Sequence, residues 1–303
     1  MSYLAIRSNC PFPGSFFPLI SRTVPMSSEA RVIENTNGLP ATSRSIIEDL
    51  VSLGVRPGNV LLIHSSLSAL GWVCGGVPAV ICALLDALGP TGTLVMPTHS
   101  TQLTDPASWT SPPVPDSWWQ IIREQALPYN PAITPTREMG AIAEAFRSWP
   151  GVMRSAHPLF SFSAYGTRAP EIVSEHSTMS FGLGEQSPLA RLYDSDASVL
   201  LLGVGFEKNT SLHLSEYRAT YPEKKFTTEG APVLLDQRRV WITMQELEFD
   251  SGDFVALGQD FLAKGLVKSA RVANADAYLM KARRLVDFGV SWLNEHRDIK
   301  RAS

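Results

Sequence analysis

Cysteine is scarce in this sequence, and its scarcity excludes disulfide-built and cysteine-metal folds. The 303 residues contain three cysteines, Cys10, Cys74 and Cys82, none of them at the paired spacing of zinc sites or redox motifs. We therefore expect free thiols, no disulfide bonds, and a reducing compartment, the cytoplasm.

Long apolar runs and excess positive charge are also lacking. The richest apolar stretch, residues 77–88, is interrupted by Asp86 and is shorter than the roughly 20 residues that span a bilayer. We therefore expect no membrane insertion. The net charge of -3 and the pI near 6.1 provide no broad basic face for a phosphate backbone, so nucleic acid is not an expected partner. A small cationic substrate is compatible with this charge.

Most of the chain has the composition of an ordinary globular protein, with 44% hydrophobic and 18% charged residues. Its beginning differs, because Arg7 and Arg22 occur there with no acid before Glu29, as in some organellar transit peptides. Four prolines in that stretch argue against the amphipathic helix of such peptides, and Met26 is an alternative start. We predict a disordered or extended segment over residues 1–40 and one folded domain over residues 41–303.

Hydrophobic periodicity predicts alternating helices and strands after residue 42. Amphipathic spacing indicates a helix over residues 43–54, and a continuous apolar run, NVLLI, indicates a buried strand at 59–63. A second helix at 78–87 begins with proline and precedes Gly89, and a second strand follows at 93–96. This order is typical of an α/β fold.

The second half is less regular. Residues 105–135 are rich in proline and tryptophan and predict a long ordered excursion with a short helix near residues 118–125, since loops of this length are usually functional. Further predictions are a helix at 139–146, buried and half-exposed strands at 199–204 and 240–249, and a closing helix at 275–296.

A polar, glycine-rich segment lies between the first predicted strand and the second helix. It includes His64, Ser65, Ser66, Leu67, Ser68, Gly71, Gly75, Gly76 and Val77. Hydroxyl groups and open glycine amides before a helix N-terminus can bind phosphate oxygens of a cofactor. Neither the dinucleotide fingerprint nor the P-loop is present. The alternative is that these glycines only allow the chain to turn.

The 199–204 strand leads to a second polar cluster. Residues 209–211 (NTS) suit a helix start, so His213 and Glu216 lie three residues apart on one helical face. A carboxylate that fixes the tautomer of an imidazole produces a general base. The alternative is a structural histidine that only makes a hydrogen bond.

Several motifs then occur in the order found in one known family. They are residues 61–76, 96–98 (MPT), 112–115 (PPVP) with 118–119 (WW), 134–142 (TPTREMGAI), 154–158 (RSAHP), 181–185 (FGLGE), 187–192 (SPLARL) and 209–217 (NTSLHLSEY). Together they resemble the aminoglycoside 3-N-acetyltransferases, over most of the chain from residue 43 to residue 294.

The resemblance implies a single α/β domain with a central mixed sheet flanked by helices, distinct from the common acetyltransferase fold. It implies direct transfer of acetyl from acetyl-CoA to the 3-amino group of a deoxystreptamine ring, without a metal. His213 would be the base, Glu216 its orienting partner, and Thr210 a candidate donor to the thioester oxyanion. Coenzyme A would contact the 64–77 segment and Thr98.

An aminoglycoside carries several ammonium groups, so acids should recognise it. Asp105 and Glu207 lie on loops near the motifs, and Glu185 is a third candidate; the alternative for each is a solvated surface acid. His99 and Glu138 stand where relatives would have an aromatic residue and glycine, which affects the details of the pocket.

The sequence leaves other functions open. The same fold and base could acetylate a biosynthetic amine. A serine hydrolase using Ser65 or Ser66 with His213 lacks the nucleophile-elbow pattern. A metallohydrolase built from His64, His99, His157 and His213 lacks ligand spacing, and a binding module would need neither base nor cofactor segment. The oligomeric state stays open, a homodimer included.

Overall fold

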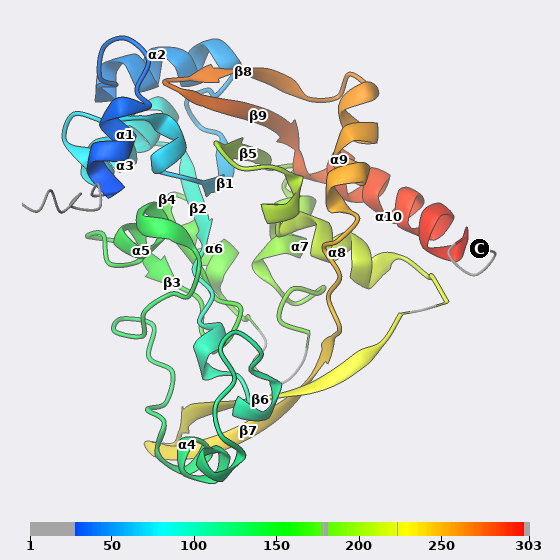
Figure 1. The fold of residues 1–303 in the computed structure, drawn as a ribbon. Helices are drawn as coiled ribbons and strands as arrows, with labels where there is room; N and C mark the ends of the chain where they lie inside the picture. Colours follow the sequence, from blue (N-terminus) through cyan, green and yellow to red (C-terminus); the bar gives the residue numbers. More distant parts are fainter. Residues whose placement is uncertain (1–27, 177, 179–180, 223, 300–303) are drawn as a thin grey trace, which may run out of the picture.

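The centre of the molecule is a seven-stranded mixed sheet (Figure 1). The computed structural model describes residues 28–176, 178, 181–222 and 224–299. In spatial order the strands are β3 (Met153–Arg154), β4 (Phe162–Gly166), β2 (Thr93–Pro97), β1 (Val60–Ser65), β5 (Ser198–Leu202), β9 (Ala275–Lys281) and β8 (Lys268–Val272). Strand β1 pairs in parallel with β2 and β5, and the strands outside these three pair antiparallel. The predicted α/β fold with a mixed sheet is confirmed.

Helices cover both faces of this sheet. One core joins α2 (Ser43–Leu53), α3 (Gly76–Leu88) and α5 (Gly140–Arg147) to alternate side chains of the central strands, such as Leu61 and Ile63. The opposite core takes the other alternate residues, such as Leu62, and packs them against the remaining helices. These are α6 (Ala169–Val173), α7 (Pro188–Asp194), α8 (Ser211–Arg218), α9 (Phe254–Ala263) and α10 (Ala282–Ile299). Burial on both faces explains why the central strands are continuously apolar.

No helix within the described part of the chain has the length and apolar character needed to cross a membrane.

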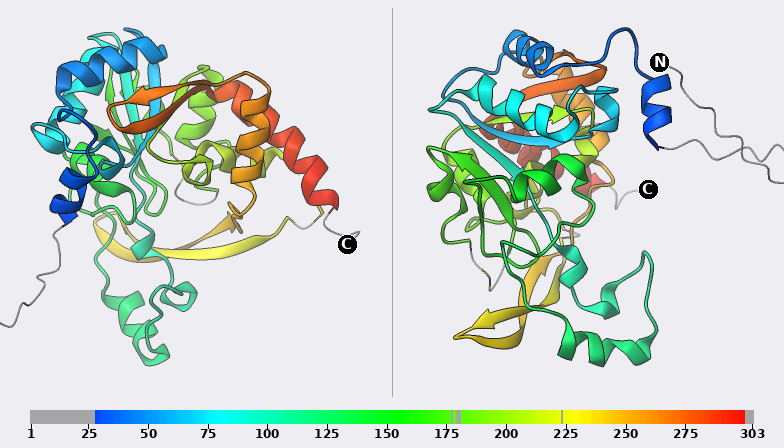
Figure 2. Two further views of the ribbon diagram at one scale, coloured as in Figure 1. Left: turned by 45° about the horizontal axis from the view of Figure 1, so that its top comes forward. Right: turned by 90° about the vertical axis from the view of Figure 1, so that its left-hand side faces the viewer.

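Two segments extend away from the sheet and lie together in both views of Figure 2. One is a hairpin of β6 (Phe226–Leu235) and β7 (Arg238–Leu247), whose two turn residues both have positive φ. The other is the predicted excursion, with α4 (Trp119–Gln125) and two short 3₁₀ helices, Pro106–Ser108 and Asp116–Trp118. The two are joined where Tyr129 donates its backbone N–H to Pro232 at 2.9 Å.

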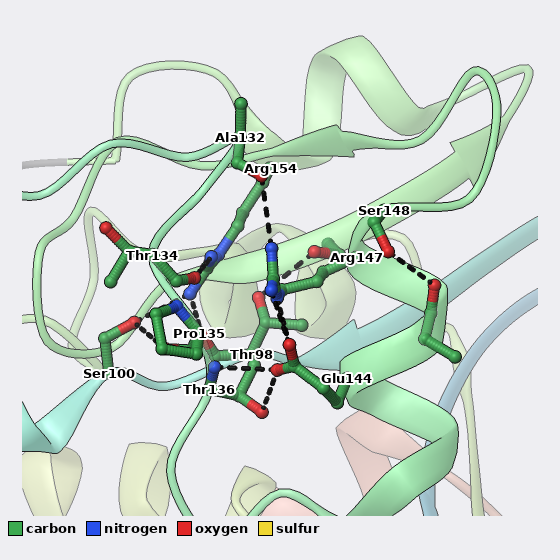
Figure 3. A network of polar contacts seen from close by, with 12 residues as sticks. Thr98, Ser100, Ala132, Thr134, Pro135, Thr136, Glu144, Arg147, Ser148 and Arg154 are labelled. Atoms are coloured by element: carbon green, nitrogen blue, oxygen red, sulfur yellow. Dashed lines mark hydrogen bonds and ion pairs between the residues drawn. The ribbon is translucent and has the colours of Figure 1, made fainter.

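A network of polar contacts fastens the end of the excursion to the sheet (Figure 3). The Arg154 guanidinium donates to the carbonyls of Thr98 and Thr134 at 2.6 and 2.5 Å, so it joins the end of β2 to the returning chain. Glu144 of α5 accepts the backbone N–H and hydroxyl of Thr136 at 2.8 and 2.7 Å. The excursion is therefore held at its base by partly buried polar groups.

Two predictions from sequence differ from the structure. The closing helix begins at Ala282 rather than at residue 275, because residues 275–281 form β9 and pair with β5. Their alternation of buried and exposed side chains, at Ala275, Ala277 and Leu279, is that of a strand. Within the predicted extended segment, residues 28–34 form helix α1 (Ser28–Glu34). Residues 1–27 lie outside the described residues.

Gly166 at the end of β4 provides a test of how closely the strands approach. Its φ is +119°, and a Cβ there would lie 2.1 Å from the carbonyl oxygen of Gly92. We expect Gly166→Ala to lower the free energy of unfolding by about 2 kcal/mol or more, measured by denaturant titration, because both backbones must shift. Gly38→Ala is the control, since its φ is also positive but nothing lies within 4 Å. Equal losses in the two variants would contradict the close approach.

Candidate active site

The candidate site lies where the three parallel strands end. Strand β1 ends at Ser65, β2 leads to Thr98 and His99, and β5 leads to the segment before α8. In open α/β sheets, ligands bind beyond the carboxyl ends of parallel strands. The two polar segments that the sequence indicates therefore meet at one edge.

The structure joins His213 and Glu216 on α8. The Nδ1 atom of His213 lies 2.6 Å from Glu216 Oε2, and the side chains are 19% and 0% exposed. An ionised carboxylate only accepts, so in this contact Nδ1 is the donor and Nε2 is the ring nitrogen directed away from Glu216. The imidazole packs against Phe249 and Phe254, with ring centroids 4.5 and 5.2 Å away. This is the geometry of an oriented base.

Glu216 is held by further contacts on its other oxygen. Oε1 accepts from the Arg297 guanidinium at 2.7 Å and from the Asp250 backbone N–H at 3.1 Å. Arg297 comes from α10, which sequence reasoning did not connect with the site. No local signal could have done so, because 81 residues separate the two.

A cavity of about 810 Å³ lies near the pair, and its lining includes Lys208 and Thr210 but neither His213 nor Glu216. That volume suits a drug-sized ligand or cofactor. Most of the predicted cofactor residues line it, namely His64, Ser65, Ser66, Leu67, Ser68, Gly71, Gly75 and Gly76. Two predicted members do not: Val77 packs against the α2–α3 core, and Thr98 is fully buried and donates its hydroxyl to the carbonyl of Ser161.

Thr210 connects the cavity with the base. Its side chain lines the cavity, and its backbone carbonyl accepts the N–H of His213 at 3.1 Å. It therefore lies at the boundary between the cofactor segment and α8, where a hydroxyl can reach a ligand in the cavity.

Two other histidines at the strand ends are buried and neutral. Burial, and next the nearby His213, lower the pKa of both His64 and His99 to about 3. The Nε2 atom of each is buried without a hydrogen-bond partner. His64 lines the cavity, whereas His99 packs edge-on against Phe160 and Phe162.

The three predicted substrate acids have different surroundings. Asp105 receives two hydrogen bonds from Arg123 at 2.9 and 2.7 Å, and Glu185 is paired in the same way with Arg218. Glu207 is exposed, lies beside the cavity-lining Lys208, and accepts the Gly205 N–H at 3.3 Å. Asp105 and Glu185 thus already have cationic partners.

Comparison with known proteins assigns the chain to a family. The family model for aminoglycoside 3-N-acetyltransferases matches residues 62–294. The chain belongs to this family. Because the members of this family are acyltransferases, the chain is an acyltransferase.

Two relatives show how far the similarity extends. The chain is 46% identical to the SPbeta prophage-derived aminoglycoside N(3')-acetyltransferase-like protein YokD of Bacillus subtilis, over 89% of this chain and 99% of that protein. It is 36% identical to aminoglycoside N(3)-acetyltransferase III of Pseudomonas aeruginosa, over 84% and 94%.

Solved structures of related proteins have the same fold as this chain. The crystal structure of YokD has a TM-score of 0.85 and 45% identity, covering 88% of this chain and 97% of that one. AAC-IIIb in a binary complex with CoASH and AAC-VIa bound to sisomicin each have a TM-score of 0.76 and 29% identity. They cover 87% and 84% of this chain, and 98% of their own.

The sequence departs from the expected pattern of this aminoglycoside 3-N-acetyltransferase family at Glu138 and His99, and the structure shows the surroundings of both residues. Glu138 has a φ of +60°, in the left-handed region that favours glycine, and it lines the cavity. His99 occupies an aromatic environment between two phenylalanines, which suits the ring that relatives would carry.

Sequence reasoning also missed two side chains of interest. Lys208 brings a positive charge to the cavity wall. Glu229 on β6 has one carboxylate oxygen buried without a partner, and burial, followed by the charge of Asp105, raises its pKa. Nothing in the local sequence of either residue signals a ligand. The described residues contain no group of three or more His, Cys, Asp or Glu side chains arranged to hold a metal.

The neutral state of His99 predicts a pH-dependent stability. The unfolded chain binds a proton at this side chain below about pH 6.5 and the folded chain does not above pH 3, so stability is lost as pH falls through this window. We expect His99→Phe to gain about 2 kcal/mol at pH 5 relative to its effect at pH 8. Urea unfolding at both pH values measures this, and parallel shifts would contradict it. His99→Gln, which also cannot titrate, separates charge from packing.

Proposed function

We propose that this protein transfers the acetyl group of acetyl-CoA to the 3-amino group of the deoxystreptamine ring of aminoglycosides. The observation that carries the proposal is the His213–Glu216 pair, which is linked through the Thr210 backbone carbonyl to a cavity lined by the cofactor segment. Family membership supplies the reaction class.

The base acts on the acceptor amine. His213 Nε2 takes a proton from the amine as the nitrogen attacks the thioester carbonyl. The new N–C bond forms, the C–S bond breaks, and the proton leaves with the coenzyme A sulfur as a thiol. Glu216 stabilises the imidazolium that forms between these steps. The Thr210 hydroxyl is the candidate donor to the carbonyl oxygen when it carries negative charge.

The cavity supports binding of a phosphate-bearing thioester. Gly75 and Gly76 lie at the start of α3, where the helix terminus favours anions, and the hydroxyl-bearing Ser66 and Ser68 line the same cavity from the segment before it. Lys208 adds a cation on the same wall. The relative AAC-IIIb is known with CoASH bound. Cavity volume, polar groups and charge all suit the same cosubstrate.

Acids on the excursion and the hairpin support a polycationic acceptor. Glu229 Oε2 and Gln102 Oε1 are buried acceptors without donors, and Asp105 is close enough to Glu229 to affect its pKa. Ammonium and hydroxyl groups of an amino sugar would supply the missing donors. AAC-VIa, a relative, is known with sisomicin bound.

A serine hydrolase mechanism receives no comparable support. It requires the hydroxyl of Ser65 or Ser66 to bond to His213. Ser66 Oγ instead lies 3.1 Å from Ser68 Oγ.

Removing the base tests the proposal directly. We expect His213→Ala to lower kcat by about 10²- to 10⁴-fold, the usual contribution of a positioned general base. Thiol release from acetyl-CoA with an aminoglycoside, and then with a panel of other amines, measures it. Calorimetry should show coenzyme A binding by this variant as by the wild type.

Glu216→Gln should reduce kcat less, because the amide can orient the ring but cannot stabilise its charge. Full activity in His213→Ala, or no binding of coenzyme A by the wild type at millimolar concentration, would refute the mechanism. Faster acetylation of a monoamine would transfer the proposal to a biosynthetic substrate with the same base.

Neutralising the unpaired acid tests the acceptor side. We expect Glu229→Gln to raise KM for an aminoglycoside several-fold, because pairing of a partly buried carboxylate with an ammonium is worth about 1 kcal/mol or more. The KM for acetyl-CoA and kcat should stay unchanged. Glu48→Gln on α2, where Glu48 is exposed and paired with Arg44, is the control. An unaltered KM in Glu229→Gln would remove this acid from the acceptor site.

A further inference from the structure

The last described turns of α10 bring a buried cation to the catalytic carboxylate. Arg297 is 7% exposed at its side chain, and it donates to Glu216 at 2.7 Å. Its remaining donors go to both oxygens of Asp253, each at 2.8 Å, and to the carbonyl of Asp250 at 2.5 Å. Burial alone would lower the pKa of Arg297, but the hydrogen bonds to Asp253 and Glu216 raise it above its ordinary value. The guanidinium is therefore permanently charged.

The charges of this group balance only when the base is protonated. Glu216 is a fully buried carboxylate and Asp253 a largely buried one, with side chains 0% and 10% exposed. Arg297 neutralises one of them. The second charge is balanced when His213 accepts the proton of the amine, so the group favours the imidazolium without leaving Glu216 alone in the protein interior.

The hydrogen bonds of Arg297 need the geometry of a guanidinium group, which simple packing against Glu216 would not require. A guanidinium fork can hold two carboxylates and a carbonyl at fixed angles, which an ammonium cannot do. The Asp250 N–H and Arg297 together occupy Oε1 of Glu216, and this leaves Oε2 directed at His213. Arg297 also lies beyond residue 294, where the match to the family model ends.

We propose that Arg297 is a positioning residue that keeps Glu216 ionised and oriented toward His213, and that Arg297 and Asp253 together set the pH at which the His213–Glu216 pair takes up its proton. This inference rests on the proposed function only for its kinetic readout. The protonation of the pair itself can be observed without any substrate.

Other charged or titratable groups also face this pair. They are His64 at the end of β1, His99 after β2, and Tyr221 and Lys224 after α8. Both histidines stay neutral above about pH 3. Burial raises the pKa of Tyr221 and lowers that of Lys224. Removing the positive charge of Arg297 and the negative charge of Asp253 in separate variants therefore isolates the effect of these two residues on protonation of the pair.

The test compares Arg297→Met with Asp253→Asn. Loss of the cation should move proton uptake by the pair to higher pH, by roughly one pH unit or more, whereas loss of the Asp253 charge should move it to lower pH. NMR titration of the His213 imidazole in the full chain measures both shifts, and the acidic limb of the kcat/KM profile should move with them. In Arg297→Met, kcat should fall by up to about 10²-fold with KM for acetyl-CoA unchanged.

Two controls separate positioning from folding. Millimolar guanidinium should partly restore kcat in Arg297→Met, and it should not affect Arg284→Ala, an exposed arginine of the same helix. Arg297→Lys, which keeps the charge without the fork, should retain the wild-type titration and lose part of kcat. If Arg297→Met does not fold, Arg297→Lys is measured in its place.

Unshifted titrations in the folded variants, or shifts of the same sign, would overturn the inference. So would a lower kcat that tracks thermal stability and is not rescued by guanidinium. If the wild type transfers no acetyl group but the titrations shift in opposite directions, the proposed function fails and the role of Arg297 stands.

Discussion

The candidate active site depends on one buried carboxylate and the donors that reach it. Glu216 is fully buried, so each of its oxygens must be satisfied within the protein. His213 comes from the same helix, but Arg297 and the Asp250 backbone come from later segments. The packing of α8 against α10 and the approach to α9 must therefore be complete before the base is oriented. A local catalytic motif thus depends on the tertiary structure of the C-terminal part of the chain.

The sequence was most informative where the chemistry is local. His213 and Glu216 are three residues apart, so helical geometry alone predicts that their side chains meet, and they do. The cofactor segment is a continuous run over residues 64–77, between a strand and a helix, and ten of its residues line one cavity. The central strands were recognisable because burial on both faces leaves an uninterrupted apolar run, as at residues 60–63.

Contacts between distant residues could not be predicted in this way. Arg297 has no local feature that distinguishes it from Arg283 or Arg284, and only the packing of α10 brings it to Glu216. Residues 275–281 have a spacing compatible with a helix, but pairing with β5 decides in favour of a strand. The ion pair of Asp105 with Arg123 depends on α4 folding back within the excursion. The charge of Asp105 is thus already neutralised by Arg123, and the sequence does not reveal it.

The division of the sheet into two faces has a consequence for how such an enzyme can diversify. The cofactor segment leads into α3, which belongs to one core, whereas the catalytic helix α8 belongs to the other. The excursion and the hairpin stand outside both cores. The excursion is joined to the sheet through the Arg154 and Glu144 network, and the hairpin forms a small apolar cluster of its own with Leu159. Substitutions on their outer surfaces can accumulate without repacking either core. Under the proposed function, acceptor range can therefore drift in evolution while the thioester-binding wall and the base remain fixed.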